Sequence, residues 1–521
     1  MRPIATTTSD FADLRKDGCI YVDKTAYFHR LISTVGTKLY FLARPRRFGK
    51  SLMITALKEI FLGRRELFDG LAIADTDWDW SQKWPVLHFE FADVDATSLE
   101  TFERSFASNV KTRLQRAGYS YDDSKLPSDN FGNAIDELSA ANDGNGTVVL
   151  IDEYDAPVSH ALDDIALANA IRDRMSAFYS QMKTRTGAIR FLMMTGVSKF
   201  TKMSVFSTLN NIVDVSQDDE YALMLGYTEE ELTANFDEHL RAHAEKMGKP
   251  YDEYRAEMKR WYNGFRFAKS DPTTVYNPIS VALTLYKKER SFSATWSSTG
   301  RASTLMKSLK RWDMLAIDPD ATRRVTERAF DVTDLANLKP IGMLYQTGYL
   351  TIKDYADGLY TLGVPDEEVR QDLNLLMAGV AADKDVEWAA DLGARLICCE
   401  WDDFFVGLKA LYAAMAYGTT EVRVHENSYG RCLAFLLASC GFRFTMEDVQ
   451  ANGRADVVAN HAVGTFIFEL KVDEPVDKAF AQIRTKNYAA PYLASGKPIW
   501  LIGLSFDSET RHLVDCAAEH L

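Results

Sequence analysis

Cysteine is scarce in this sequence. Six cysteines occur in 521 residues and none forms a Cys-X-X-Cys pair, which argues against a disulfide framework and a cysteine-ligated zinc finger. No run reaches the roughly 18 consecutive apolar residues that a membrane helix needs, and the polar stretch 1–11 lacks the apolar core of a signal peptide. These absences predict a cytoplasmic protein with reduced thiols and no membrane partner.

An excess of positive charge is also missing. Lys and Arg number 60 and Asp and Glu number 74, which gives a formal net charge of −14. This charge argues against adhesion of the whole surface to nucleic acid or to an anionic membrane, although it leaves room for a local basic groove. The motifs GxSxG and HExxH are absent as well, so the serine hydrolase and zinc protease classes have no support.

Four apolar runs in the first half predict buried strands. Residues 37–43, 86–91, 147–151 and 189–194 are apolar or alternate, and helical patterns such as 51–61 separate them. Such runs are typical of a parallel sheet covered on both faces. The predicted fold class is therefore α/β, with a first domain over 1–290.

The remainder of the chain predicts two further domains. Residues 337–364 indicate a helix and then two strands about a turn at 354–358, as in a winged-helix module, so a helical lid and winged-helix-like region is expected over 291–415. A helix at 429–438, strands at 454–459, 464–472 and 498–504, and a helix at 476–488 predict a compact α/β domain over 416–521.

The segment 44–51, RPRRFGKS, follows a predicted strand and opens a predicted helix. Gly49, Lys50 and Ser51 form the end of a P-loop, in which backbone N–H groups cradle phosphates, the lysine reaches the terminal phosphates and the serine binds Mg²⁺. Arg44 stands where the usual pattern has glycine. Taken alone, the segment could also be an ordinary polar helix start.

A second motif supports a nucleotide site. The segment 148–155, VVLIDEYD, ends a buried strand with Asp152 and Glu153. Asp152 could hold Mg²⁺ through water and Glu153 could polarise the attacking water. The next strand ends in TGVSK at 195–199, and a polar residue there could sense the γ-phosphate or could simply belong to a turn.

Several motifs together resemble the predicted AAA-ATPase-like family of bacteria and archaea: YVDKT at 21–25, RPRRFGKS, VVLIDEYD, TGVSKFTKMSVFSTLNN at 195–211 and WYNGFRF at 261–267. The family shares arginine at the first loop position. The resemblance implies a P-loop NTPase fold that binds ATP with Mg²⁺. The loop residues Arg46, Arg47 and Phe48 are then expected at the nucleotide, as are Asp23 and Lys24. Arg266 is a candidate γ-phosphate sensor, with a solvated surface arginine as the alternative.

The C-terminal domain carries paired acids with a lysine. Asp456 lies in one predicted strand, and Glu469 and Lys471 lie on one face of the next, because they are two residues apart. Two carboxylates and an ammonium inside apolar strands are costly unless they are paired or bind metal. A metal site and a buried salt bridge are both compatible with this spacing.

With Glu426, Gln482 and Tyr488 added, this pattern resembles the PD-(D/E)XK nuclease superfamily over about 420–510. The resemblance implies a restriction-endonuclease-like domain. It also implies that Glu426, Asp456 and Glu469 are metal ligands, Lys471 is the catalytic lysine and Gln482 is a supporting residue. Ala455 stands where the usual pattern has proline.

Together the motifs predict an ATP-binding, ATP-hydrolysing protein with a nuclease domain that cleaves phosphodiester bonds with Mg²⁺ or Mn²⁺. We expect the ATP state to gate cleavage or partner binding. DNA rather than RNA is the expected substrate, and the protein could form oligomers. From Glu421 onward there are 10 Lys and Arg against 13 Asp and Glu, so a local groove or the winged-helix module must contact the substrate. Two alternatives remain open. One is an ATP-dependent switch or scaffold whose nuclease-like domain only binds nucleic acid or a protein partner. The other is a nucleotide-gated nuclease that binds ATP and never turns it over.

Overall fold

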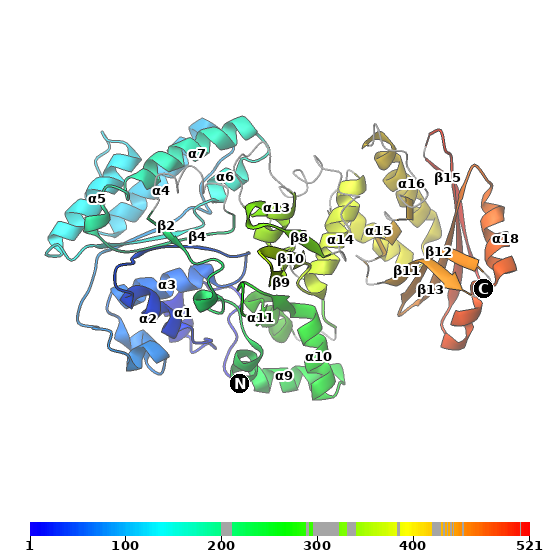
Figure 1. Cartoon of the computed structure of the whole chain (residues 1–521), viewed down its shortest axis with the longest axis horizontal. Coiled ribbons are helices and arrows are strands. Elements are labelled where there is room, and N and C mark those ends of the chain that lie inside the picture. The colour runs from blue at the N-terminus through cyan, green and yellow to red at the C-terminus, as the bar shows by residue number, and fades with distance from the viewer. Residues whose placement is uncertain are drawn as a thin grey trace. The chain divides into compact units, whose positions relative to one another are not determined.

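The computed structural model describes residues 1–198, 211–287, 291–294, 322–330, 340–382, 386–418, 429–430, 433–434, 436–437, 440, 442–450, 453–510 and 512–521. The chain forms two compact units (Figure 1). The N-terminal unit comprises residues 1–293 and 322–367, and the C-terminal unit comprises residues 294–321 and 368–521. The predicted boundaries at 290 and 415 differ from this division, because the winged part of the middle region belongs to the N-terminal unit.

A five-stranded parallel sheet forms the centre of the N-terminal unit, in the order β2-β3-β4-β1-β5. The strands are β1 (Leu39–Ala43), β2 (Val86–Glu90), β3 (Thr147–Asp152), β4 (Ile189–Gly196) and β5 (Val213–Asp214). The first four coincide with the four predicted runs. β3 is buried along its whole length, as its uninterrupted apolar sequence requires.

Helices cover both faces of this sheet (Figure 1). On one face lie α4 (Leu99–Arg116), α5 (Pro127–Ala141), α6 (Ala156–His160) and α7 (Ile165–Ser180); on the other lie α1 (Phe11–Lys16), α2 (Thr25–Ser33) and α3 (Lys50–Phe61). Phe89 of β2 packs edge-on against Phe131 of α5 and Phe178 of α7, with ring centroids 5.2 and 5.5 Å away. This aromatic core fixes the first helical layer on the sheet.

The rest of the N-terminal unit is mainly helical, with two small sheets. It contains α9 (Glu229–Met247), α10 (Tyr251–Tyr262), β6 (Asn263–Phe265), β7 (Val275–Tyr276) and α11 (Pro278–Lys287). A winged part follows, made of β8 (Arg323–Val325), α13 (Pro340–Thr347), β9 (Thr351–Ala356) and β10 (Leu359–Gly363). The predicted hairpin is confirmed: β9 and β10 pair about Asp357 and Gly358, both at positive φ, and β8 adds a third strand that the sequence did not predict.

The C-terminal unit contains a mixed sheet in the order β11-β12-β13-β14-β15. Its strands are β11 (Arg443–Gln450), β12 (Gly453–His461), β13 (Gly464–Val472), β14 (Ile499–Phe506) and β15 (Leu513–His520); only β13 and β14 are parallel. The helix α18 (Val476–Lys486) packs on one face through Phe480 and Ile483. The opposite face packs against α15 (Val386–Ile397) and α16 (Trp401–Gly418), and α14 (Glu367–Ala382) precedes them.

The three central strands and α18 were predicted, whereas the two edge strands β11 and β15 were not. The predicted helix at 429–438 lies partly outside the described residues. Among the helices of the described ranges, none combines the length and apolar character that a bilayer crossing demands.

Candidate active sites

The phosphate-binding loop lies between the end of β1 at Ala43 and the start of α3 at Lys50. Gly49 has φ +89° and Arg47 has φ +67°, so the loop turns sharply before the helix. A Cβ on Gly49 would meet no atom within 4 Å, which means that the backbone conformation rather than crowding favours glycine there. Arg46, Arg47, Gly49 and Ser51 are half-buried along this turn.

Lys50 is buried at the start of α3. Its ammonium Nζ donates hydrogen bonds to the carbonyl oxygens of Arg44 at 3.0 Å and Pro45 at 2.9 Å. Burial lowers the pKa of Lys50, while the charges of Asp152 and Glu153 oppose that shift. The ammonium therefore lies inside the loop and within the field of the two acids.

Both acids lie at the end of β3. Asp152 is buried and its Oδ1 accepts hydrogen bonds from Thr195 Oγ1 at 2.5 Å and from the Glu153 N–H at 3.0 Å. Since β4 lies between β1 and β3, Thr195 is placed between the loop strand and the acidic strand. Glu153 has φ +49°, and burial raises the pKa of its carboxyl. The structure thus gathers Lys50, Asp152, Glu153 and Thr195 at one edge of the sheet.

Arg44 has a role that the sequence pattern did not indicate. Its buried guanidinium donates to the Ser216 carbonyl and to the Tyr221 carbonyl, and lies 4.1 Å from the centroid of the Phe267 ring. Burial lowers its pKa to about 10. The arginine in place of the usual glycine therefore fastens the segment after β5 to the end of β1.

Two other predicted residues, Phe48 and Lys24, also have packing roles. Phe48 is buried with its ring edge-on to Phe265 at 4.8 Å and Phe267 at 5.2 Å. Lys24 Nζ forms a buried ion pair with Glu231 at 2.6 Å and donates to the Leu223 carbonyl at 2.8 Å. These contacts engage the Phe48 ring and the Lys24 ammonium in the fold, so only backbone atoms at these two positions are available to a nucleotide.

Hydrogen bonds within the fold also hold the side chains of Asp23 and Arg266. Asp23 accepts from the Thr25 N–H at 2.8 Å and the Ala72 N–H at 2.7 Å. Arg266 is neither a surface arginine nor an open sensor: it is buried, and its guanidinium donates to the carbonyls of Ala268, Lys353 and Lys269. It ties the segment after β6 to β9.

Glu90 is a site residue that sequence reasoning missed. It ends β2 and pairs in register with Asp152, so both side chains lie on the face of the sheet that α3 covers. Burial and then the charge of Asp152 raise the pKa of Glu90. An acid at the last position of a strand was the available signal, but the strand order was needed to place it beside Asp152.

The second site lies on β12 and β13 of the C-terminal unit. Asp456 Oδ2 accepts a hydrogen bond from the Leu470 N–H at 2.7 Å, which brings this carboxylate to β13. Lys471 Nζ lies 2.8 Å from Glu469 Oε1. The other carboxylate oxygen, Glu469 Oε2, is buried and has no hydrogen-bond partner among the described residues.

An unpaired buried carboxylate oxygen beside a second carboxylate fits a hard divalent cation. Glu426, the predicted third ligand, lies outside the described residues, and the described residues contain no group of three or more His, Cys, Asp or Glu side chains that could hold a metal. Asp456 and Glu469 would therefore hold the cation from the protein side together with water or with a ligand from the segment that is not described.

Gln482 and Tyr488 form a small network next to this site. Gln482 Nε2 donates to the Tyr488 hydroxyl at 3.3 Å, and that hydroxyl donates to the Arg454 carbonyl at 2.8 Å. Arg454 lies two residues before Asp456 on β12. The network thus ties α18 and the residues after it to the strand that carries Asp456.

Two family models match the parts of the chain that carry these residues. A family model described as predicted AAA-ATPase matches residues 4–206, and a model of the PD-(D/E)XK nuclease superfamily matches residues 424–516. The chain belongs to the predicted AAA-ATPase family and carries a C-terminal domain of the PD-(D/E)XK nuclease superfamily.

One curated relative matches along its full length. The uncharacterised protein in the vnfD 5′ region of Azotobacter chroococcum mcd 1 is 34% identical, and the alignment covers 100% of this chain and 99% of that protein. No solved structure matches the chain.

The stability of the metal-free C-terminal unit should depend on Glu469. Burial, reinforced by Asp456, raises the pKa of Glu469 from 4.5 to about 7. A raised pKa means that the protonated form favours folding, so this stability is fully present below pH about 4.5 and is lost as the pH rises through about 7. The loss amounts to about 3 kcal/mol.

We therefore expect the parent protein in EDTA to lose about 3 kcal/mol more stability between pH 5 and pH 8 than Glu469→Gln does. Hydrogen exchange of peptides from β12 and β13 reports this unit separately. Glu509→Gln, at an exposed position, is the control and should follow the parent. Identical pH profiles for the parent and Glu469→Gln would contradict the assignment.

Proposed function

We propose that the protein binds and hydrolyses ATP at the N-terminal site and cleaves phosphodiester bonds of nucleic acid at the C-terminal site, with the ATP state gating cleavage or partner binding. The observation that carries the nuclease part is the convergence of Asp456, Glu469 and Lys471, with one buried Glu469 oxygen left without a partner. The two family matches, in the same order along the chain, support the combination.

At the N-terminal site, Lys50 would pair with the β- and γ-phosphates and the N–H groups at the start of α3 would bind phosphate oxygens. Ser51 and Asp152 would hold Mg²⁺, and Glu153 would orient and polarise the attacking water. Thr195 donates to Asp152 and so keeps that carboxylate oriented. Each role uses a group that the fold already holds at the sheet edge.

At the C-terminal site, Asp456 and Glu469 would hold Mg²⁺ or Mn²⁺, which supplies positive charge and a bound water of lowered pKa. Lys471 is half-buried beside Glu469 and can orient or deprotonate a water for attack on phosphorus. Gln482 acts through Tyr488 to support the strand that bears Asp456. DNA is the proposed substrate.

The test is a cleavage assay on mixed DNA and RNA, with and without ATP and with Mg²⁺, Mn²⁺ or EDTA. The proposal predicts cleavage that needs the metal and changes with ATP. Metal-independent binding of nucleic acid with no cleavage under any of these conditions would instead favour the switch or scaffold function.

Lys50→Ala should weaken ATP binding at least about 10-fold, a loss of about 1.4 kcal/mol or more, because it removes the ammonium that meets the terminal phosphates. Titration with a fluorescent ATP analogue measures this. Lys246→Ala removes an exposed lysine from α9 and should bind as the parent does. Unchanged affinity in a folded Lys50→Ala protein would overturn the P-loop assignment.

A further inference from the structure

A polar groove runs along α4 in the N-terminal unit. Its volume is about 510 Å³, and eight of its nine lining residues belong to α4, recurring every three or four residues from Thr101 to Arg116. These eight are arginine, serine, threonine and asparagine, and none is acidic. The opposite side of the helix carries the buried Phe102, Phe106, Val110 and Leu114, so the groove side faces away from the core.

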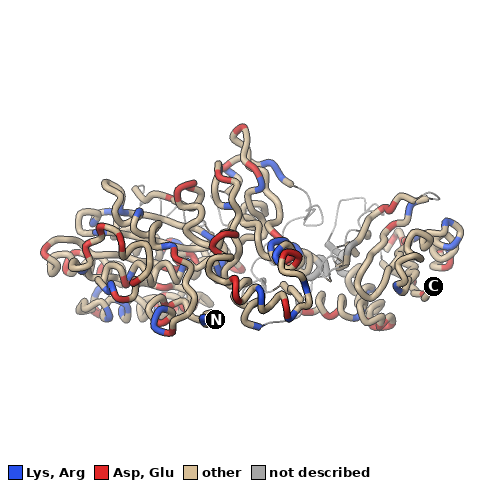
Figure 2. The backbone as a smooth tube through the Cα atoms, turned by 90° about the horizontal axis from the view of Figure 1, so that it is seen from below, with Lys and Arg blue, Asp and Glu red and all other residues tan. Residues whose placement is uncertain are grey.

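The groove carries a net positive charge in an acidic protein. Blue and red segments are interspersed over the described part of the chain (Figure 2). The groove instead has Arg104, Arg113 and Arg116 against a single carboxylate, Asp95. Arg104 and Arg116 are exposed. The charge of Arg104 acts on Asp95, although no hydrogen bond or ion pair joins these two side chains, and Arg116 forms no hydrogen bond or ion pair within the described residues.

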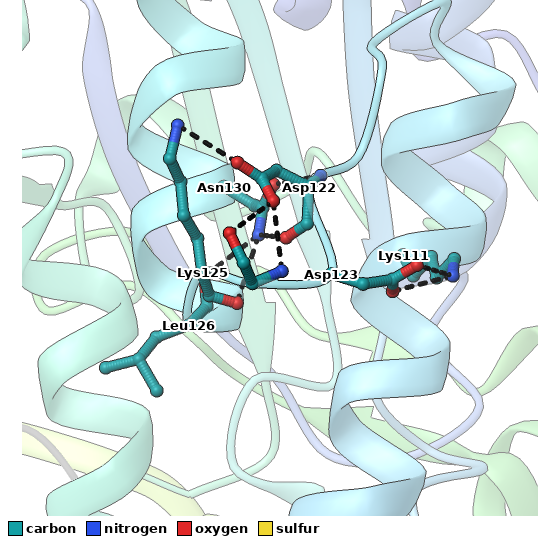
Figure 3. Close-up of polar contacts among 7 residues, drawn as sticks. Lys111, Asp122, Asp123, Lys125, Leu126 and Asn130 are labelled. Atoms are coloured by element: carbon teal, nitrogen blue, oxygen red, sulfur yellow. Dashed lines mark hydrogen bonds and ion pairs between the residues drawn. The ribbon is translucent and has the colours of Figure 1, made fainter.

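Other cations near this helix are already paired. Lys111 Nζ lies 2.7 Å from Asp123, and Lys125 lies 3.4 Å from Asp122, in the loop that Asn130 organises (Figure 3). Arg174 of α7 lies 2.8 Å from Glu103. Arg104 and Arg116 differ from these neighbouring cations, because no carboxylate forms an ion pair with them among the described residues. Their guanidinium groups can therefore bind an anionic ligand.

Two groove residues contact Glu90 at the end of β2. Arg113 Nη2 lies 3.6 Å from Glu90, and Asn109 donates to the Glu90 carbonyl at 3.0 Å. Glu90 is the strand-end acid that pairs in register with Asp152. The groove therefore passes beside the acids at the edge of the parallel sheet.

The length of the groove favours a polymer over a single phosphate. The helix rises about 22 Å from Thr101 to Arg116, because fifteen steps separate these residues at about 1.5 Å each. That length corresponds to about six nucleotides at about 3.4 Å each along one strand. Arginine, serine, threonine and asparagine are also the side chains that commonly contact the phosphates and sugars of nucleic acids.

We propose that this α4 groove binds the phosphodiester backbone of nucleic acid. The proposal rests on the proposed nuclease function, because it supplies the positive surface that the nuclease domain lacks: 10 Lys and Arg against 13 Asp and Glu from Glu421 onward. Contacts to the backbone imply little preference for base sequence and a strong dependence on salt.

The test measures binding of the full chain to a fluorescein-labelled 20-base-pair DNA by fluorescence anisotropy, in EDTA and without ATP, so that neither activity is needed. The double variant Arg104→Gln/Arg116→Gln should bind the DNA at least about 10-fold more weakly than the parent. The negative slope of log K against log salt should become shallower by about 1.8. Lys246→Gln/Arg260→Gln removes two exposed charges from α9 and α10 and should change binding less than twofold.

Equal loss in both double variants, or no loss in the groove variant, would overturn the proposal. Displacement of the DNA by phosphate-free poly-glutamate at equal charge concentration would also overturn it and would point to an acidic protein partner. If DNA binding follows these expectations but no cleavage is detected, the binding role of the groove is supported and only the proposed nuclease activity is refuted.

Discussion

Cleavage of nucleic acid should fall at least about 10³-fold in Asp456→Ala and in Glu469→Ala, because both variants lose a ligand of the metal that supplies several kcal/mol of transition-state stabilisation. Each carboxylate is held by the fold: Asp456 by the Leu470 N–H, and Glu469 by burial beside Lys471. Conversion of supercoiled plasmid to nicked and linear forms measures the rate. Glu509→Ala, at an exposed turn, should cleave as the parent does.

The variant Lys471→Ala separates metal binding by the two carboxylates from catalysis by the lysine. It should also abolish cleavage, but the metal should stay bound or bind more tightly, because an ammonium is not a metal ligand and its removal deletes a positive charge beside the cation. A purely structural salt bridge predicts something else. Each of the three changes would then cost about 3–5 kcal/mol of stability, since a buried charge loses its partner.

Glu153→Gln should leave ATP binding nearly unchanged and lower ATP hydrolysis about 10²-fold or more, the usual contribution of a general base. The amide keeps the shape of the side chain and loses the charge that polarises water. Phosphate release under saturating ATP measures the rate, and Glu230→Gln on the exposed side of α9 is the matched control.

Glu90→Gln tests the competing assignment of the base. Glu90 pairs in register with Asp152 on the same face of the sheet, so it is the other acid that could activate water. Full hydrolysis in Glu153→Gln together with its loss in Glu90→Gln would move the role of the base from β3 to β2. Full hydrolysis in both variants would contradict carboxylate-assisted hydrolysis at this sheet edge.

The buried strands could be predicted from the sequence, whereas the edge strands could not. β3 is a continuous apolar run because neighbours cover both of its faces. β11 and β15 lie at the two edges of the C-terminal sheet and contain exposed and half-buried residues such as Val449 and Val514, so no apolar period marks them. β5 has only two residues, which is too short for any pattern.

The chemistry of the sites was predictable where it depended on local spacing. Glu469 and Lys471 share a face because they are two residues apart in a strand, and Asp152 lies at the end of an apolar run. The roles of Arg44, Lys24 and Arg266 were not predictable. Each of these residues has a partner far away in the sequence. These partners are Ser216, Glu231 and Lys353, respectively, and only the tertiary fold brings them close.

The central claim is that Asp456 and Glu469 form a metal site, and calorimetric titration of the metal-free full chain with Mn²⁺ tests it most directly. The account predicts that the parent and Lys471→Ala take up Mn²⁺ and that Glu469→Ala does not. No uptake by the folded parent, with Glu469→Ala and Lys471→Ala both destabilised, would contradict it and leave these residues as a structural salt bridge.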